Sequence, residues 1–368
     1  MKIVVLTSSR ADYSIYLPLL NTLRSDSDFL LSIIPFGTHL SKKHGETINE
    51  IIKDGFNIEV SVDTMVEGDD PVDISTAIGK TILAFSKIWE NDDSDLILAL
   101  GDRYEMFSAC VASVPFGKKI AHIHGGETTI GAFDDFFRSA ISGISLIHFV
   151  TSKIYKKRVS QIKGSIKNIF NVGALSIDNL RNLQLYSIEE FKFKFGIDMS
   201  KPSILITFHP ETINYKKNEF FCLELLSALN ETTGYQFIFT MPNADTFGIK
   251  IRKLIKKFIQ LNKNAFGVES FGTIGYLSCM KHCSFMLGNT SSGFVEASFF
   301  PKYVINLGER QTGRIVTENI RNCDISKKSI KNKILEFPDF IMPEMISIYG
   351  DGNSSIKIKK ILKKYKIE

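Results

Sequence analysis

Short runs of apolar residues alternate along the chain with longer stretches whose apolar positions follow helical spacing. This alternation is typical of parallel β-sheets covered by helices on both faces. The runs are rich in Ile, Leu and Val and lack apolar–polar alternation, as expected for strands buried on both faces. Two sets of strands are predicted: first Ile3–Thr7, Leu30–Pro35, Asp95–Leu100, Lys119–Ile123 and Ile147–Thr151, then Ser203–Phe208, Tyr235–Met241, Ala265–Val268, Ser284–Leu287 and Tyr303–Leu307.

A polar stretch at residues 180–200 separates the two sets and ends in Met199-Ser200-Lys201-Pro202, which is typical of a connection between domains. With 368 residues, the chain also exceeds the size that one hydrophobic core usually organises. We therefore expect two doubly wound, Rossmann-like α/β domains that face one cleft, at residues 1–185 and 186–350. In such sheets, ligands bind beyond the carboxyl ends of the strands.

The formal net charge of +5 comes from the last residues of the chain, since residues 356–368 contain six lysines and one glutamate. The rest of the chain is thus neutral. Residues 351–368 are expected to form an amphipathic helix that packs back on the first domain, because apolar residues follow helical spacing there (Ile358, Ile361, Leu362 and Tyr365). A lysine-rich face could bind a membrane surface or RNA, but a solvated face is commoner, so neither partner is expected.

Several protein classes fit the sequence poorly. The apolar run at the amino terminus is too short for a signal peptide, and no stretch of about 18 apolar residues occurs, so we expect a cytoplasmic protein. Gly79-Lys80-Thr81 resembles the end of a P-loop, but Ile74 stands where its first glycine belongs, and no G-x-G-x-x-G follows the first strand. Cys279 and Cys283 lack a second ligand pair at zinc-like spacing, which favours ordinary core cysteines.

Titratable residues gather directly after predicted strands of the first domain. The clusters are Gly101-Asp102-Arg103-Tyr104-Glu105, Ala121-His122-Ile123-His124-Gly125-Gly126-Glu127 and Phe133-Asp134-Asp135-Phe136-Phe137-Arg138. Asp102, His124 and Asp134 should converge at one edge of the sheet, as proton transfer to and from carbon requires. Gly125 and Gly126 would let the backbone approach a ligand closely. A helix cap at Asp102, first-turn acids at 134–135 and a hydrogen-bonded core histidine at His122 are the structural alternatives.

Candidate anion-binding groups follow strands of both domains. Arg10 comes just after the first strand, where its guanidinium suits diphosphate oxygens, although capping of Asp12 is about as plausible. In the second domain, Gly288-Asn289-Thr290-Ser291-Ser292-Gly293 joins a strand to a helix, and its hydroxyls and amides could cradle an anion. An ordinary serine-capped helix is the alternative. Glu296 could accept hydrogen bonds from ribose, and Arg310 could add a cation.

Six motifs, in this order along the chain, resemble those of one family: Ser-Arg-Ala-Asp-Tyr, Gly-Asp-Arg-Tyr-Glu, His-Gly-Gly-Glu, Phe-His-Pro-Glu-Thr, Gly-Asn-Thr-Ser-Ser-Gly and Arg-Gln-Thr-Gly-Arg. The family is the hydrolysing UDP-N-acetylglucosamine 2-epimerases of sialic-acid and related nonulosonic-acid pathways, and the resemblance runs from residue 1 to about Arg314. It implies a fold like that of GT-B glycosyltransferases, a homodimer or homotetramer, and a UDP-linked 2-acetamido sugar as substrate. It also implies a mechanism without cofactor or essential metal. UDP is eliminated to leave a glycal, and water then adds with inversion, giving a free sugar such as N-acetylmannosamine.

The resemblance also assigns site residues. It implies acid–base roles for Asp102, His124, Glu127 and Asp134, and places His209 near the leaving phosphate. The implied substrate-binding set is Arg10, Arg103, Arg138, Asn243, Thr290, Ser291, Ser292, Gly293, Glu296 and Arg310, with the diphosphate held by Arg10, Ser291, Ser292 and Arg310 and the ribose by Glu296. Many relatives have glutamate at the position of His124, and a residue is inserted between Glu127 and Asp134. Either His124 or Glu127 therefore carries the proton.

Two other functions would use the same motifs. A GT-B glycosyltransferase would share the fold and the nucleotide cradle, but it normally needs only one base for its acceptor. A non-catalytic sensor would bind a UDP-sugar without turnover. Among epimerases, enzymes acting on UDP-N,N'-diacetylbacillosamine in legionaminic-acid synthesis would share nearly all the motifs, because the reaction involves the same carbon.

Overall fold

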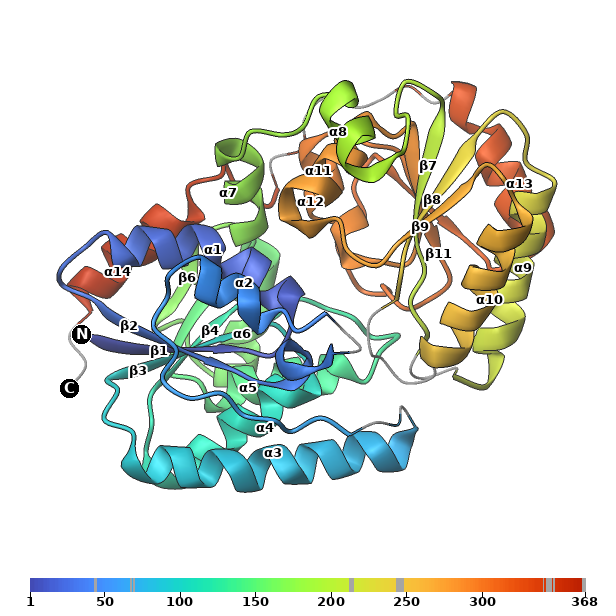
Figure 1. The fold of residues 1–368 in the computed structure, drawn as a ribbon. Coiled ribbons are helices and arrows are strands. Elements are labelled where there is room, and N and C mark those ends of the chain that lie inside the picture. Colours follow the sequence, from blue (N-terminus) through green and yellow to red (C-terminus); the bar gives the residue numbers. More distant parts are fainter. Residues whose placement is uncertain are drawn as a thin grey trace. The chain divides into compact units, whose positions relative to one another are not determined.

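The structure is a computed structural model that describes residues 1–42, 45–66, 68, 70–211, 215–242, 248–339, 341, 346 and 348–365. The chain divides into two compact units, each with its own sheet and core (Figure 1). The first unit comprises Met1–Glu127, Asp134–Arg181 and Ile348–Glu368, and the second comprises Thr128–Phe133 and Asn182–Ser347. The chain therefore passes between the units a few residues before the expected positions at 185 and 350. The segment Thr128–Phe133, expected in the first domain, groups with the second unit.

The first unit is built on a parallel sheet of six strands in the order β2-β1-β3-β4-β5-β6. The five strands predicted from the sequence are present with ends within one residue of the prediction, and the edge strand β6 was not predicted. Their bounds are β1 (Lys2–Thr7), β2 (Leu30–Pro35), β3 (Leu96–Leu100), β4 (Ile120–Ile123), β5 (Ile147–Val150) and β6 (Ile169–Asn171).

Both faces of this sheet are buried, which explains the lack of apolar–polar alternation. In β1, Ile3 and Val5 pack into one hydrophobic cluster, whereas Val4 and Leu6 pack into another on the opposite face. Helices α1 (Arg10–Arg24) and α14 (Ser354–Lys364) cover the first face, and α3 (Pro71–Asn91), α4 (Tyr104–Ser113) and α5 (Asp134–Ile144) cover the second. The unit also contains α2 (Ile48–Lys53), α6 (Lys153–Lys163) and α7 (Leu175–Asn182).

Helix α14 carries the carboxy-terminal lysines. Its Ile358 and Leu362 are buried in the cluster that α1 lines. The lysine face is not simply solvated, because Lys363 pairs with Asp26 at 2.9 Å and with Asp28 at 2.8 Å. The basic tail thus fastens the last helix to the first unit.

The second unit is built on another parallel sheet, in the order β12-β11-β10-β7-β8-β9. Counted along this unit the order is 3-2-1-4-5-6 from the β9 edge, as in Rossmann domains. The strands are β7 (Ser203–Thr207), β8 (Gln236–Thr240), β9 (Ala265–Val268), β10 (Phe285–Gly288), β11 (Val304–Leu307) and β12 (Ile320–Cys323). The edge strand β12 was not predicted.

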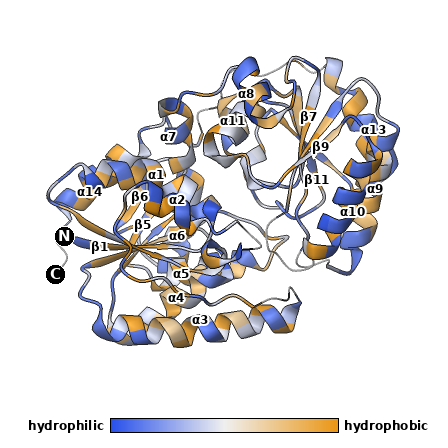
Figure 2. Cartoon of the chain, viewed as in Figure 1, coloured by the Kyte–Doolittle hydropathy of each residue, from blue (hydrophilic) through white to orange (hydrophobic). Residues whose placement is uncertain are grey.

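Helices cover both faces of this second sheet. One face packs against α9 (Asn218–Asn230), α10 (Gly248–Leu261) and α13 (Lys327–Leu335), and the other against α8 (Ile188–Phe195), α11 (Gly272–His282) and α12 (Glu296–Phe299). The expected connection at 180–200 therefore includes helix α8, whose Phe191 is buried in the core. In both units the strands are mainly hydrophobic, and the surrounding helices carry hydrophobic and hydrophilic residues on different sides (Figure 2).

This architecture confirms the predicted fold class of two doubly wound parallel α/β sheets. It also indicates where ligands should bind, because the order in which the chain adds strands to the sheet switches direction between β1 and β3 in the first unit and between β7 and β10 in the second. Gly79-Lys80-Thr81 lies inside α3, where it cannot form a phosphate loop. Within the described part of the chain, no helix is long and apolar enough to cross a membrane.

Candidate active site

In the first unit, Arg138 of α5 contacts residues of the loops that follow β3 and β4. Its side chain is buried, and its guanidinium donates to the Asp102 carboxylate and, at 2.7 Å, to the backbone carbonyl of His124. It also lies 3.9 Å from a carboxylate oxygen of Glu127. The Asp102 side chain is 21% exposed, whereas that of Glu127 is 4% exposed. The expected acid–base residues Asp102, His124 and Glu127 thus share one buried arginine.

His124 and Glu127 also face each other, with 3.5 Å between His124 Nδ1 and Glu127 Oε1. The same carboxylate oxygen accepts a hydrogen bond from Thr151 at 3.2 Å, and Arg158 donates to the Glu127 backbone carbonyl at 3.0 Å. His124 has a φ of 64°, in the left-handed region that residues other than glycine rarely occupy. Backbone strain of this kind concentrates at functional sites, where the surrounding contacts hold it in place.

The glycines after His124 are required by packing inside the unit. A Cβ at Gly125 would lie 2.9 Å from both His122 Nδ1 and Ser142 Oγ, and one at Gly126 would lie 2.7 Å from the Tyr155 carbonyl. The sequence led us to expect that a ligand approaches the backbone closely at these glycines. In the structure, it is other atoms of the first unit that do so. These contacts fix the course of the chain between His124 and Glu127.

His122 is a hydrogen-bonded core residue, which the sequence left open as the alternative to a role in the site. Its Nε2 lies 2.8 Å from the Gly101 carbonyl and its Nδ1 lies 3.0 Å from Ser142 Oγ. Because a carbonyl only accepts, Nε2 carries the proton and Ser142 donates to Nδ1. Burial lowers the pKa of His122 to about 3, so the ring is neutral.

The other predicted residues of the first unit occupy distinct places. Arg103 forms a two-pronged pair with Glu105, at 3.1 Å and 2.9 Å. Asp134 opens α5, one turn before Arg138 and on the same side of the helix. Arg10 is half-buried in the first turn of α1, next to Ser9, whose side chain caps that helix. The alternative partner for Arg10, Asp12, is satisfied by two hydrogen bonds from Ser8, at 3.0 Å from its N–H and 2.6 Å from its hydroxyl.

In the second unit, Asn289 links the loop after β10 to the loops after β7 and β11. Its side chain is fully buried; its Oδ1 accepts from the His209 N–H at 2.7 Å and its Nδ2 donates to the His209 carbonyl at 2.8 Å. Its own carbonyl accepts from Gln311 at 2.8 Å and from Arg310 at 3.3 Å. One asparagine therefore holds the segments that carry His209, Arg310 and the Ser291–Ser292 pair. Gly288 before it is obligatory, because a Cβ there would lie 1.9 Å from the Thr207 carbonyl.

The serine-rich turn differs from the expected helix start. Residues Ser291–Gly293 form a single 3₁₀ turn, and the following α12 has only four residues. A helix dipole therefore adds little here, and any anion would be held by hydroxyls, backbone amides and arginine. Thr290 caps the turn by accepting from the Ser292 N–H at 3.4 Å. Ser291 is exposed, and Glu296 is half-buried at the start of α12.

The segment Thr128–Phe133, which we call the 128–133 arm, packs against the loop that carries Arg310. The Ile130 N–H donates to the Thr312 carbonyl at 2.9 Å, and a Cβ at Gly131 would lie 1.9 Å from the Glu309 carbonyl. Glu211 also holds this loop, because its carboxylate accepts from the Glu309 N–H at 3.0 Å. Along the chain, the arm directly connects Glu127 to Asp134.

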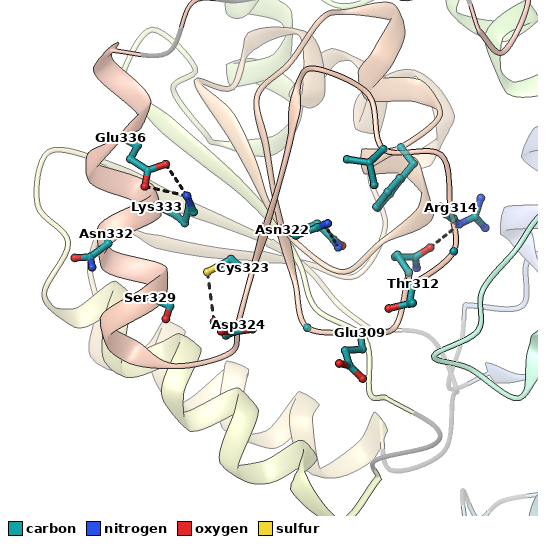
Figure 3. A pocket seen from close by; sticks show the side chains of 16 residues that line it. Glu309, Thr312, Arg314, Asn322, Cys323, Asp324, Ser329, Asn332, Lys333 and Glu336 are labelled. Atoms are coloured by element: carbon teal, nitrogen blue, oxygen red, sulfur yellow. Dashed lines mark hydrogen bonds and ion pairs between the residues drawn. The ribbon is translucent and has the colours of Figure 1, made fainter.

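A cavity of about 570 Å³ lies beyond the carboxyl ends of β11 and β12. Glu309, Thr312 and Arg314 line one side of it, and Asp324, Ser329 and Asn332 line the other (Figure 3). Its wall also contains the Lys333–Glu336 ion pair at 2.8 Å. The wall carries two cations, Arg314 and Lys333, and three carboxylates, those of Glu309, Asp324 and Glu336, so its net charge is negative and suits a diphosphate poorly.

The site residue Asn243 and the motif residue Thr212 lie outside the described residues. Within the described part, the sequence interpretation overlooked Asn289, Glu211 and Tyr276 as individual residues. Asn289 and Glu211 had a signal, because each stands inside a recognised motif directly after a buried strand. The sequence contained no signal for Tyr276, because it lies within α11 and outside the recognised motifs at 208–212 and 288–293.

Comparison with known proteins places these motifs in a family. The model of the UDP-N-acetylglucosamine 2-epimerase family matches residues 21–363. A Campylobacter jejuni protein named GDP/UDP-N,N'-diacetylbacillosamine 2-epimerase (hydrolyzing) is 34% identical over 92% of this chain and 88% of its own length. The UDP-N,N'-diacetylbacillosamine 2-epimerase (hydrolyzing) of Legionella pneumophila is 31% identical over 98% and 95%, and the polysialic acid biosynthesis protein P7 of Escherichia coli is 33% identical over 89% and 84%.

Solved structures agree with the fold. The UDP-N-acetylglucosamine 2-epimerase of Neisseria meningitidis, solved with UDP-N-acetylglucosamine, superposes with a TM-score of 0.84 at 17% identity over 99% of this chain and all of its own. The Methanocaldococcus jannaschii enzyme gives the same values. These neighbours show the GT-B-like two-domain fold, and the sequence relatives confirm the resemblance. The chain therefore belongs to the UDP-N-acetylglucosamine 2-epimerase family.

Proposed function

We propose that the chain releases UDP from a UDP-linked 2-acetamido sugar and inverts the acetamido-bearing carbon, C2. The observation that carries this proposal is the convergence of Asp102, His124 and Glu127 on Arg138 at the carboxyl ends of β3 and β4. Elimination and rehydration of one ring need several proton-transfer groups close together, and this cluster supplies them. Family membership and the hydrolysing relatives support the same reaction.

In the first half-reaction, a base removes the proton from C2. The electron pair of that C–H bond forms the C1=C2 double bond, and the bond from C1 to the diphosphate oxygen breaks, which releases UDP. We assign the base to His124, because imidazole titrates near neutral pH. Glu127, at 3.5 Å from Nδ1, would orient the ring and stabilise the imidazolium that results. The burial of Glu127 favours this supporting role over contact with the sugar.

In the second half-reaction, water adds to the glycal. Its hydroxyl bonds to C1 while a proton is delivered to C2 on the face opposite to the one it left, so the free sugar emerges with inverted configuration. We assign this proton delivery to Asp102 and Asp134. The Asp102 carboxylate is 21% exposed, more than that of Glu127, and Arg138 fixes its orientation. Asp134 lies one helical turn before Arg138.

The second unit would bind the UDP moiety. The hydroxyls of Thr290, Ser291 and Ser292 and the Arg310 guanidinium are suited to the diphosphate, with Glu296 for the ribose and His209 beside the leaving phosphate. Asn289 ties the segments that carry these groups together. We assign Arg10 of the first unit to the diphosphate as well.

For the sugar itself we propose UDP-N-acetylglucosamine or UDP-N,N'-diacetylbacillosamine, which undergo the same chemistry at C2. The names of the Campylobacter jejuni and Legionella pneumophila relatives favour the second substrate. Turnover of both UDP-sugars, measured side by side at equal concentration, decides between them. The preferred substrate should show the higher kcat/KM by at least tenfold.

Proton NMR of the reaction in heavy water tests the chemistry. The released 2-acetamido sugar should carry deuterium at C2, with UDP as the second product and with no nicotinamide or divalent metal added. Retention of the substrate's hydrogen at C2 would overturn the elimination mechanism. Release of UDP only after an acceptor is supplied would instead identify a glycosyltransferase. Tight binding of the UDP-sugar without turnover would identify a sensor.

A further inference from the structure

A tyrosine outside the recognised motifs contacts the serine-rich turn of the second unit. Tyr276 of α11 places its hydroxyl 2.5 Å from Ser292 Oγ. Ser292 Oγ in turn lies 3.1 Å from Thr290 Oγ1. The Tyr276 hydroxyl is therefore directly linked to the hydroxyls proposed to bind the diphosphate.

The same hydroxyl is supported from the sheet. Thr207, the last residue of β7, is within hydrogen-bonding reach of Tyr276, and its Oγ1 lies 2.6 Å from Thr240 Oγ1 at the end of β8. A chain of five hydroxyls thus runs from Thr240 through Thr207, Tyr276 and Ser292 to Thr290. Its members come from β8, β7, α11 and the turn after β10, which all belong to the second unit.

The direction of this chain decides what Ser292 can offer a ligand. Each hydroxyl has a single proton to donate. If Ser292 donates to Tyr276, its proton points away from a ligand and its oxygen lone pairs would repel an anion. If Tyr276 donates to Ser292, the proton of Ser292 is available for a phosphate oxygen, and the bond is strengthened because Ser292 is itself an acceptor. Burial raises the pKa of Tyr276, so it keeps the proton needed for the second arrangement.

We propose that Tyr276 is a positioning residue that donates to Ser292 and thereby turns the Ser292 proton toward the diphosphate of the bound UDP-sugar. This inference rests on the proposed function, which supplies the anion. Tyr276 acts through Ser292 and need not touch the ligand. Its contribution is therefore confined to the diphosphate and does not extend to the nucleoside.

Binding measurements with Tyr276→Phe test this role, because the change removes only the hydroxyl. The Kd for UDP should rise about tenfold, as expected for one weakened hydrogen bond to a charged group. The Kd for uridine, which has no phosphate, should stay within twofold of the wild-type value. Tyr303→Phe is the matched control, since it removes a hydroxyl from the same unit whose bond, to the Lys333 carbonyl at 3.5 Å, lies elsewhere. It should leave both constants unchanged.

A double-mutant cycle with Ser292→Ala separates a relay from two independent contacts. If Tyr276 acts through Ser292, Tyr276→Phe should weaken UDP binding no further once Ser292 is alanine. Additive losses, or an equal loss for uridine and UDP, would overturn the positioning role. Failure of the wild-type protein to bind UDP would instead sink the proposed function, so the two failures are distinguishable.

Discussion

At the scale of single residues, the contact between Asp102 and Arg138 joins a proposed proton-transfer group to a buried arginine. Arg138 is buried and also bonds the His124 carbonyl, so it fixes the strained backbone of His124 as well as the Asp102 carboxylate. The family resemblance implied a substrate-binding role for Arg138, whereas its contacts favour positioning of the proposed acid–base residues.

Replacing Asp102 with asparagine should lower kcat at least a hundredfold while the Kd for UDP stays within threefold. The amide keeps the shape of the side chain but cannot exchange a proton with the sugar. UDP binding should persist, because the second unit carries most of the proposed phosphate ligands. Steady-state kinetics and calorimetry with UDP measure the two quantities.

Asp135→Asn provides a matched control for this prediction. Asp135 also pairs with an arginine, Arg158, at 2.8 Å, and it stands next to Asp134 on the same helix. Its loss should reduce kcat less than tenfold. If Asp102→Asn proved no more damaging than Asp135→Asn, Asp102 would have no part in proton transfer.

Asn289→Asp tests whether the loops of the second unit must be held together. Aspartate has the same shape, but it places a carboxylate oxygen where Nδ2 donates to the His209 carbonyl at 2.8 Å. Two acceptors then face each other, so the His209 loop should shift and kcat should fall at least tenfold. Asn306→Asp is the control, because Asn306 is also buried and donates to Asn322 at 2.9 Å in the same sheet. Asn289→Asp should also lose roughly 1–3 kcal/mol of stability, and equal kinetics in the two variants would contradict the prediction.

These residue contacts also show what the sequence could predict. Motifs after buried strands located Asp102, His124, His209 and the 288–293 turn, because the ends of parallel strands share an edge of the sheet. The partners that orient them could not be found in this way. Arg138 reaches Asp102 across 36 positions, and Tyr276 reaches Ser292 from a neighbouring helix across 16. Such contacts depend on tertiary packing, which spacing along the chain does not encode.

At the scale of elements, the predicted strands comprise all the central strands of both sheets and two edge strands, β2 and β9. The missed strands β6 and β12 are edge strands with three and four residues, and they contain polar residues such as Asn171, Arg321 and Asn322. The edge strands β2 and β9 were predicted because their sequences are mainly apolar, whereas β6 is very short and β12 has polar residues at its centre, so neither carries the apolar run on which the prediction depends. Helix α8 was missed for a related reason, since only Phe191 of its residues is buried.

The position of the 128–133 arm, which groups with the second unit, was not expected from the sequence. Gly131→Ala should displace it, because the new Cβ would lie 1.9 Å from the Glu309 carbonyl, next to Arg310. Since the arm joins Glu127 directly to Asp134, we expect kcat to fall at least tenfold and the Kd for UDP to rise. Kinetics and calorimetry again measure both quantities.

Gly79→Ala is the control for this substitution. Gly79 lies in the interior of α3 with no atom within 4 Å of the added Cβ, so the change should stabilise the protein by about 1 kcal/mol and leave kcat unchanged. If Gly131→Ala behaved like Gly79→Ala, the arm would have no influence on the site.

At the scale of the whole molecule, three buried histidines make stability depend on pH. Burial lowers the pKa of His122 to about 3 and those of His39 and His148 to about 4, against an ordinary value of 6.5. All three lie in the first unit, where His122 and His148 are paired across β4 and β5. The folded protein thus keeps them neutral at pH values where the unfolded chain would protonate them.

The free energy of unfolding should therefore fall as the pH is lowered from 7 toward 4. A histidine with a depressed pKa contributes stability that is present above about 6.5 and is lost as the pH falls toward its folded pKa, because the unfolded state then binds the additional proton. Each histidine contributes a slope of up to about 1.4 kcal/mol per pH unit within this window. Urea unfolding at pH 7, 6 and 5 measures the slope. His148→Leu removes one titrating group at a core position of β5. The pH slope of its unfolding free energy should be smaller by the contribution of one histidine, up to about 1.4 kcal/mol per pH unit. A wild-type stability that did not change between pH 7 and pH 5, or an unchanged slope in His148→Leu, would show that these buried histidines do not control the acid sensitivity of the fold.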